Sequence, residues 1–409
     1  MNFSIIQILA VAGAAGSLAS VGYYALCLWS AANFLRRKAG GSTRPTLAWP
    51  PASVLKPLKG LDPGMHENFR SHCLQDYAEY EIVFGVSDRN DPAAAAVRQL
   101  QEQFPQRPIR LLVCEENLGV NTKVSALAQM LRQARHEYIV VNDSDIRVDP
   151  GYLKTVIAPL VGDSSQVPGQ DDSPAPQNVY ADGKQKVGLV TCLYRGVAGP
   201  TLGSRLESVG ISTDFAAGVL AARQLEGGVH FGLGSTLAFR RADLLAAGGF
   251  EAFVDYLADD YQLGNRLSQG GSHGVLSEAI VETRLPPYRF AEFLAHQLRW
   301  ARTVRDSRPA GYAGLILTFG LPWALLTLMC SRGAPWAWWL LAIVVAARVA
   351  VALVIGRAVL DDRQVMPLLP LLPLRDLVAL VVWARALFGN TVVWRGEKFH
   401  LRAGKLTRL

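Results

Sequence analysis

The stretch Tyr138-Ile-Val-Val-Asn-Asp-Ser-Asp145 indicates how the middle of this chain folds. Its first four residues predict a short buried strand, and the polar residues after them lie where that strand ends. Asp143 and Asp145 are two positions apart, so an extended backbone holds both carboxylates on the same side. Two carboxylates placed in this way can bind one hard cation, which could bridge to a diphosphate. For this motif alone, a solvated strand end remains the alternative.

Short apolar runs alternate with helical patterns from about residue 49 to residue 308. Strands are predicted at residues 53–55, 81–87, 109–114, 138–142 and 188–193, and helices at 64–75, 93–103 and 122–134. Such alternation is typical of an α/β domain with a mostly parallel sheet, whose ligands bind at the carboxyl ends of the strands. Asp88 and Asp143 lie at such ends. The polar stretch at residues 162–186 is predicted to be a mobile insertion in this domain.

The N-terminal end of the chain is predicted to be a retained membrane anchor, residues 1–35. Half of all residues are hydrophobic, which is more than a soluble protein of this length needs. Residues 3–30 carry no formal charge, and Arg36, Arg37 and Lys38 follow them. Basic residues on this flank indicate a cytoplasmic exit, whereas a cleaved signal peptide would place positive charge before its apolar core.

The C-terminal membrane region is predicted at residues 312–390. Residues 312–330 and 335–355 are predicted to be spanning helices. Residues 366–388 contain three charges and three prolines, so a spanning helix, a re-entrant hairpin and an interfacial helix all remain open. The basic tail at residues 391–409 favours the cytoplasmic face, which two spans and an interfacial third segment would satisfy and three full spans would not.

Charge and cysteine content exclude some classes of protein. The net charge of +7 is spread over the flanks and the tail, so nucleic acid is not expected as a partner, whereas anionic lipid headgroups are. The five cysteines form no Cys-x-x-Cys pair. This pattern fits a reducing compartment and predicts neither a zinc site nor a disulfide framework.

Two further motifs and one lysine offer groups that could bind or react. Asp88 ends the predicted strand at 81–87 and could accept hydrogen bonds from a nucleoside, or could form an Asx turn before a helix. Lys123 could contact phosphate, although a surface lysine is the default interpretation. Asp259 and Asp260 are adjacent carboxylates near a helix start, where one could act as a general base or both could complement the helix dipole.

The last motif is His296-Gln-Leu-Arg-Trp300, just before the C-terminal membrane region. Gln297 offers an amide, Arg299 a bidentate cation for phosphate and Trp300 an indole platform. A Trp beside an Arg at a membrane edge can equally be an interfacial anchor.

These motifs, in this order and with these gaps, resemble those of membrane-bound inverting glycosyltransferases of the type-A nucleotide-sugar fold. Three segments are more narrowly similar to the ceramide glucosyltransferase family: Leu55-Lys-Pro-Leu-Lys-Gly-Leu-Asp62, residues 76–92, and Trp394-Arg-Gly. The family's bacterial relatives that glycosylate hopanoid lipids are especially similar. The resemblance covers about residues 53–399. It implies an α/β type-A fold with transmembrane helices at both ends.

The resemblance also implies roles for single residues. Asp145 would be the ligand of Mg²⁺ or Mn²⁺ with Asp143 supporting it, and Asp260 would be the catalytic base, with Asp259 as the less favoured candidate. Gly232-Leu-Gly-Ser-Thr236 has little side-chain bulk, which would let its backbone approach the donor sugar closely. The implied donor-binding residues are Lys56, Asp88, Lys123, Asp143, Gly234, Gln297, Arg299 and Trp300.

The activity expected from this resemblance is transfer of glucose or N-acetylglucosamine from a UDP-sugar to the hydroxyl of a membrane lipid. It would take place at the cytoplasmic face of a bacterial inner membrane. Animal ceramide glucosyltransferases have a functional histidine before the Gly-rich stretch, but this chain has none between Val187 and Val229. That departure favours a hopanoid or another lipid alcohol over ceramide. A processive polysaccharide synthase, which shares the Arg-Trp pair of this last motif, and an inactive membrane scaffold are the alternatives.

Overall fold

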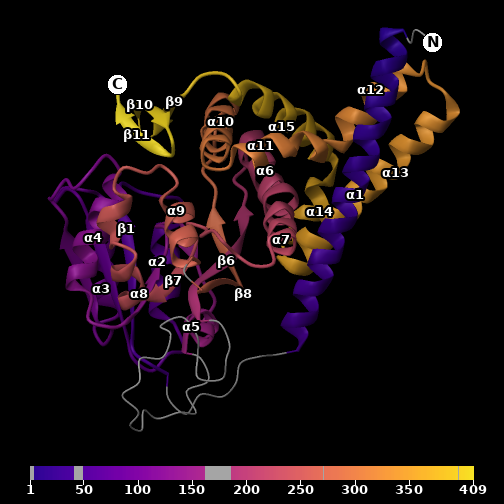
Figure 1. Ribbon diagram of the computed structural model, residues 1–409. Helices are drawn as coiled ribbons and strands as arrows, with labels where there is room; N and C mark the ends of the chain where they lie inside the picture. The colour runs from indigo at the N-terminus through magenta and orange to yellow at the C-terminus, as the bar shows by residue number, and fades with distance from the viewer. Residues whose placement is uncertain (1–3, 41–48, 162–185, 270, 395) are drawn as a thin grey trace.

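The computed structural model describes residues 4–40, 49–161, 186–269, 271–394 and 396–409. Nearly all of the predicted polar insertion at 162–186 lies outside the described residues. Within them, Figure 1 shows an α/β domain, a group of long apolar helices beside it, and a small C-terminal sheet.

An eight-stranded mixed sheet forms the centre of the α/β domain. Its order is β3-β2-β1-β4-β7-β6-β8-β5. The strands β3, β2, β1 and β4 are parallel, β7 runs antiparallel to both of its neighbours, and β6 and β8 are again parallel. The bounds are β1 (Ala52–Leu58), β2 (Tyr80–Val86), β3 (Ile109–Val113), β4 (Tyr138–Val141), β5 (Ile146–Arg147), β6 (Val187–Val197), β7 (Leu237–Arg240) and β8 (His273–Arg284). All five predicted strands are present.

Helices cover both faces of this sheet. The three predicted helices are present as α2 (Met65–Cys73), α3 (Ala93–Gln103) and α4 (Thr122–Gln133). The others in the domain are α5 (Tyr152–Val161), α6 (Leu202–Gly210), α7 (Ala216–Leu225), α8 (Arg241–Ala246), α9 (Asp259–Leu267) and α10 (Phe290–Ser307), with the 3-10 turn η2 (Phe250–Phe253) before α9. A π-helical turn, η1 (Ile211–Phe215), joins α6 to α7.

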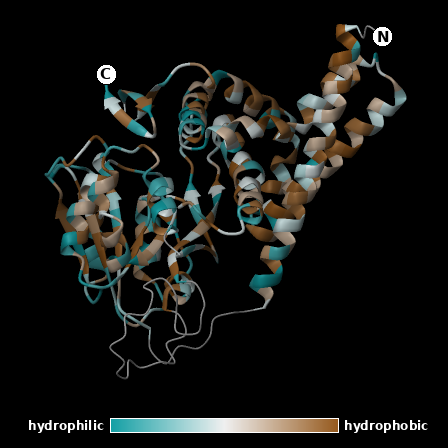
Figure 2. Ribbon diagram, viewed as in Figure 1, coloured by the Kyte–Doolittle hydropathy of each residue, from teal (hydrophilic) through white to brown (hydrophobic). Residues whose placement is uncertain are grey.

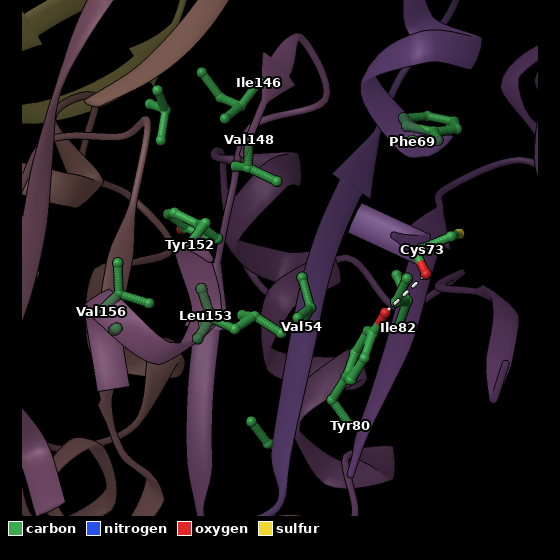
Figure 3. Close-up of a cluster of buried hydrophobic side chains, with 14 of the residues drawn as sticks. Val54, Phe69, Cys73, Tyr80, Ile82, Ile146, Val148, Tyr152, Leu153 and Val156 are labelled. Atoms are coloured by element: carbon green, nitrogen blue, oxygen red, sulfur yellow. Dashed lines mark hydrogen bonds between the residues drawn. The ribbon is translucent and has the colours of Figure 1, made fainter. Parts of the chain in front are cut away.

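Neighbouring strand residues point to opposite faces and so build two separate cores. On one face, Val54 and Ile82 pack with Phe69 of α2 and Tyr152 of α5 (Figure 3). The hydroxyl of Tyr80 donates to the backbone oxygen of Cys73 at 3.0 Å and ties α2 to the sheet there. On the other face, the residues next along the same strands pack against α4. These two layers hold the carboxyl ends of β1 and β4 in fixed positions.

Three helices of the described chain are long and apolar enough to cross a membrane: Ile5–Ala39, Pro335–Val359 and Val365–Ala386. The first, α1, lies against the helices that follow residue 319 (Figures 1 and 2). The third predicted segment is a single helical stretch of 22 residues and not a hairpin. The elements are α1 (Ile5–Ala39), α11 (Pro309–Gly314), η3 (Leu315–Thr318), α12 (Gly320–Cys330), α13 (Pro335–Val351), η4 (Ala352–Val359), α14 (Val365–Leu368), η5 (Leu369–Leu371) and α15 (Leu372–Ala386).

The predicted spanning helix at residues 312–330 is bent in the structure. This stretch is two helical pieces, Pro309–Thr318 and Gly320–Cys330, bent by 52°. Phe319 between them has non-helical angles, φ −83° and ψ 64°. Pro322 lies in the first turn of α12, where a missing backbone N–H is tolerated, but it could not continue a helix that began before residue 319.

A buried cluster of ion pairs joins the apolar helices to the α/β domain. Arg348 of α13 is 6% exposed, and its Nη2 lies 2.8 Å from Oδ1 of Asp376 in α15. The same guanidinium pairs with Asp214 of η1 and donates to the backbone oxygen of Thr213 at 3.1 Å. Arg375 Nε lies 3.1 Å from the other oxygen of Asp214. The cluster therefore ties α13 and α15 to the π-helical turn.

We expect Arg348→Ala to destabilise the protein by about 3–5 kcal/mol, because it leaves the buried Asp376 with too little positive charge around it. Thermal unfolding in detergent measures this. Arg357→Ala is the matched control, because Arg357 lies in η4 and pairs with Asp361 in a largely exposed ion pair. That variant should lose no more than about 1 kcal/mol. Equal losses in the two variants would contradict the assigned role of the buried cluster.

The predicted basic tail is a folded antiparallel sheet in the structure. Its strands are β9 (Thr391–Trp394), β10 (Glu397–Arg402) and β11 (Lys405–Arg408). Leu257, just before α9, donates its N–H to the backbone oxygen of Gly404 at 3.0 Å and is buried together with Phe399 and Leu401. Ala403 and Gly404 both have positive φ, as a tight hairpin turn requires. The tail therefore supports the segment that leads to Asp259 and Asp260.

Candidate active site

A cavity of about 910 Å³ opens at the carboxyl ends of the strands, where the sheet topology predicts a ligand. Five aspartates line it: Asp62, Asp143, Asp145, Asp259 and Asp260. Of the residues predicted from the sequence, Lys123, Asp143, Asp145, Gly234, Asp259, Asp260, Arg299 and Trp300 line this cavity. The structure thus brings together motifs that lie more than 150 residues apart.

Lys123 is not a surface lysine. Its Nζ lies 2.7 Å from Oδ1 of Asp143 and 3.4 Å from Oδ2 of Asp259, and its side chain is 12% exposed. Burial alone would lower the pKa of Lys123, but Asp143 and Asp259 raise it above its ordinary value, so the ammonium stays charged. Asn121 caps α4 and also donates to Asp259 at 3.3 Å. The start of α4 therefore orients Asp143 of the Asp-x-Asp motif and Asp259 of the adjacent pair Asp259-Asp260.

Lys56 lies behind the Asp-x-Asp turn. It is fully buried, does not line the cavity, and donates from Nζ to the backbone oxygen of Asp143 at 2.8 Å. Burial lowers the pKa of Lys56 to about 7, although Asp145 and Asp143 act in the opposite direction. This geometry holds the turn in place, and the role in donor binding implied by the resemblance stays a prediction.

Asp145 is a carboxylate kept close to a second negative charge. One of its oxygens accepts a hydrogen bond from Oγ1 of Thr283 in β8. Burial, and after it the charge of Asp143, raise the pKa of Asp145 to about 6. A nearby cation would stabilise the charged form of the Asp145 carboxylate.

Asp260 is held by two backbone amides at the start of α9. Its Oδ2 accepts from the N–H of Gly234 and its Oδ1 from the N–H of Tyr261, both at 2.8 Å. Burial and the neighbouring Asp259 raise the pKa of Asp260 to about 6. A Cβ at Gly234 would lie 2.9 Å from Asp143 Oδ2 and 3.3 Å from Asp260 Oδ2, so a larger residue here would displace at least one of these carboxylates.

The raised pKa of Asp260 predicts a pH dependence. Only its carboxylate form can accept a proton, so kcat/KM should fall about tenfold for each pH unit below about 6 and be level between pH 7 and 8. Saturating Mn²⁺ is used because protonation of Asp145 would weaken metal binding over the same range. A rate that stays level down to pH 4.5, in protein shown to remain folded, would contradict Asp260 as the base.

Three predicted residues lie outside the main cavity. Asp88 is exposed at the end of β2, where its Oδ1 accepts from the N–H of Asn90 at 2.8 Å, which is the Asx turn of the alternative interpretation. Gln297 is buried and lines an adjacent crevice of about 210 Å³. Lys56 is the third, as described above. No contact seen here tests nucleotide binding by Asp88, which stays a prediction.

The sequence interpretation missed several residues of the cavity wall. Glu207 and His296 are hydrogen-bonded there, and Trp394 reaches the cavity from the C-terminal sheet. His296 belongs to a motif quoted above, but its partner is 89 residues away and no local pattern marks it. Asp62, the last residue of another quoted motif, accepts a hydrogen bond from Ser144 between the two aspartates.

Asp143 and Asp145 fit a small divalent cation. They are hard oxygen ligands, and both line the same cavity. Among the residues that the structure describes, no group of three or more His, Cys, Asp or Glu could hold a metal. A cation would therefore take its remaining ligands from substrate phosphates and water, as Mg²⁺ commonly does.

The fold and the comparisons define a class of protein. The structure is similar to a solved mannosyltransferase of Pyrobaculum calidifontis, PcManGT, in complex with GDP-Man and Mn²⁺ (TM-score 0.51, 18% identity, covering 94% of this chain and 99% of that one). This similarity confirms the predicted type-A glycosyltransferase fold. The family described as glycosyl transferase family 21 matches residues 13–167 and 177–407. The chain belongs to that family and is a glycosyltransferase.

Curated relatives agree with this assignment. The chain is 23% identical to ceramide glucosyltransferase 3 of Caenorhabditis elegans over 87% of its length and 73% of that protein. It is 22% identical to the ceramide glucosyltransferase of Komagataella phaffii over 88% of its length and 85% of that protein. The predicted resemblance to the ceramide glucosyltransferase family is thus confirmed.

Proposed function

We propose that this protein transfers a sugar from a UDP-sugar to the hydroxyl of a membrane lipid, with inversion at the anomeric carbon. One observation carries the proposal most directly. The cavity that contains Asp143, Asp145 and Asp260 continues to Tyr23 of α1 and to Leu315 of η3. A single cavity therefore connects the acidic site to helices of the membrane region. The names of the relatives support the same class of acceptor.

The arm of the cavity toward the membrane helices is suited to a hydrocarbon chain. α7 contributes small and apolar residues to it, namely Gly218, Val219, Ala221, Ala222 and Leu225. A lipid that presents its hydroxyl here keeps its apolar body out of water, which avoids a cost of about 0.8 kcal/mol per methylene. Glu226 and Arg308 line the same arm and form an ion pair between α7 and the end of α10.

The chemistry assigned to the site is a single displacement. Asp260 takes the proton of the lipid hydroxyl while the oxygen attacks the anomeric carbon from the face opposite the diphosphate. The bond from that carbon to the diphosphate breaks and UDP leaves with the electron pair. Arg299 binds the diphosphate oxygens in a bidentate manner. Asp143 and Asp145 would hold Mg²⁺ or Mn²⁺, which when bound supplies positive charge for the departing diphosphate.

We also infer on which side of the membrane the site lies. The basic last turn of α1, with Arg36, Arg37 and Lys38, favours a cytoplasmic position for the α/β domain in a bacterial inner membrane, where UDP-sugars are present. The sugar is glucose or N-acetylglucosamine. The acceptor is a hopanoid or another lipid alcohol, because the histidine that animal ceramide glucosyltransferases use is missing between Val187 and Val229.

A transfer assay tests the proposal. Purified protein in lipid nanodiscs is mixed with radiolabelled UDP-glucose or UDP-N-acetylglucosamine, Mn²⁺ and a total lipid extract of the expressing bacterium. Label should enter the organic phase with the native protein and not with Asp260→Asn. Release of UDP without lipid labelling, with both donors, would contradict lipid transfer. A labelled polymer would instead indicate a polysaccharide synthase.

A further inference from the structure

A row of aromatic rings forms part of the cavity wall. Tyr288 stacks on His296 with ring centroids 5.5 Å apart and an interplanar angle of 29°. His296 lies 4.8 Å from Trp300, which in turn lies 6.4 Å from Phe215. All four rings line the cavity. His296 therefore packs between the rings of Tyr288 and Trp300 and is open to the cavity.

Glu207 is the hydrogen-bond partner of the His296 imidazole at Nδ1. This carboxylate lies on α6 and is 2% exposed, and its Oε2 is 3.1 Å from Nδ1 of His296. A buried carboxylate is costly unless a partner compensates it, and His296 is the hydrogen-bond partner that the described structure gives it. An apolar residue would fill the same space between α6 and α10 without this cost. The presence of the Glu207 carboxylate at this buried position therefore indicates that the site requires one orientation of the His296 ring.

The geometry selects one tautomer of the neutral ring. A carboxylate accepts hydrogen bonds, so in the neutral ring Nδ1 carries the proton and donates a hydrogen bond to Glu207. Nε2 then has a free lone pair and acts as a hydrogen-bond acceptor. The side chain of His296 is 19% exposed and reaches the cavity. The wall thus presents one oriented acceptor to a bound molecule.

Asp260 and His296 reach the cavity from different elements, α9 and α10. The hydrogen bonds of Asp260 go to Gly234 and Tyr261, and none joins it to His296 among the described residues. In the proposed reaction, Asp260 receives the proton of the hydroxyl that attacks the sugar. Nε2 of His296, on another wall of the cavity, could then accept a hydrogen bond from a second O–H or N–H group of the same lipid. Trp300 beside it gives an apolar surface for the carbon atoms between the two groups.

We propose that Glu207 and His296 form a positioning pair for the lipid acceptor. Nε2 of His296 accepts a hydrogen bond from a hydroxyl or amide N–H adjacent to the hydroxyl that receives the sugar. The pair thereby selects polyol or amino-alcohol headgroups over simple alcohols. This inference rests on the proposed lipid glycosylation and adds the chemical class of headgroup to it.

The kinetic test uses His296→Phe, which keeps the ring stacking and removes the acceptor atom. With a total lipid extract of the expressing bacterium as acceptor, its apparent KM should rise about tenfold. The KM for UDP-sugar and the rate of UDP-sugar hydrolysis should change less than about twofold. His66→Phe is the matched control, because His66 lies on α2 away from the cavity, and it should leave all three constants unchanged.

Three outcomes separate this inference from the proposed function. Inactivity of the native protein on every lipid contradicts the proposed function. An unchanged lipid KM in an active His296→Phe variant, or an equal rise in the KM for UDP-sugar, overturns the positioning pair. Mass spectrometry of the labelled lipid gives a further check: a headgroup with one hydroxyl and no N–H contradicts the inference.

A readout that needs no activity examines the ring itself. Nitrogen-15 NMR of labelled histidine, assigned by difference from His296→Phe, should show a protonated Nδ1 and an unprotonated Nε2 at pH 8. Glu207→Leu should shift the ring toward the Nε2-protonated form that is usual in water. A native ring that is protonated at Nε2 would overturn the proposal, because that atom could not accept a hydrogen bond.

Discussion

Asp260→Asn should lower the rate of sugar transfer at least about a hundredfold while binding of UDP-sugar persists. The carboxylate is held by the N–H groups of Gly234 and Tyr261, and an amide of the same size fills the same space. What the amide lacks is the capacity to take a proton from the attacking hydroxyl. Single-turnover transfer, with calorimetric titration of UDP-sugar, measures both quantities.

Asp259→Asn is the control for this variant. Asp259 pairs with Lys123 and accepts from Asn121, so its carboxylate serves the charge balance and the start of α9. We expect a loss clearly smaller than that of Asp260→Asn. A larger loss than for Asp260 would assign the base to Asp259. Near-normal turnover by folded Asp260→Asn would refute general-base catalysis by that residue.

Removal of divalent metal should stop the reaction, and Mg²⁺ or Mn²⁺ should restore it. The two carboxylates of the Asp-x-Asp turn would form the proposed site for this cation, and Asp145→Ala should bind UDP-sugar poorly even at high metal concentration. Asp149→Ala is the matched control, because Asp149 is exposed just beyond β5 and does not line the cavity. Its activity should equal that of the native protein.

Full activity in a chelator would contradict this role. It would mean that the positive charge on the diphosphate comes from the protein, with Arg299 as the group in position. Normal UDP-sugar binding by Asp145→Ala would point the same way. Either result would leave the fold and the base assignment intact, since neither depends on a cation.

The sheet and its acidic edge could be predicted because their signals are local. β2 and β4 are mostly apolar runs, each followed two residues later by an aspartate, and parallel strands bring such ends to one edge of a sheet. Asp143, Asp145 and Asp260 accordingly line one cavity. Asp260 lies at the start of α9 and not at a strand end, so only the resemblance predicted that it belongs to this site.

Other features depend on contacts that no local pattern reveals. The C-terminal sheet was predicted only as a basic tail, since its apolar residues alternate over very short strands and are buried by Leu257, far away in sequence. The bend before α12 depends on one non-helical residue inside a uniformly apolar stretch. The contact of the buried Lys56 with the backbone of Asp143 joins residues 87 positions apart, and no local pattern marks it.

Mass spectrometry of the lipids of a bacterium that expresses the protein tests lipid glycosylation most directly. The account predicts a lipid species heavier by one hexose or one N-acetylhexosamine, present with the native protein and absent with Asp260→Asn expressed at the same level. The mass of the unmodified lipid identifies the acceptor in the same spectrum. Identical lipid profiles for the two strains, with native protein folded in the membrane and both nucleotide sugars present in the cell, would contradict it.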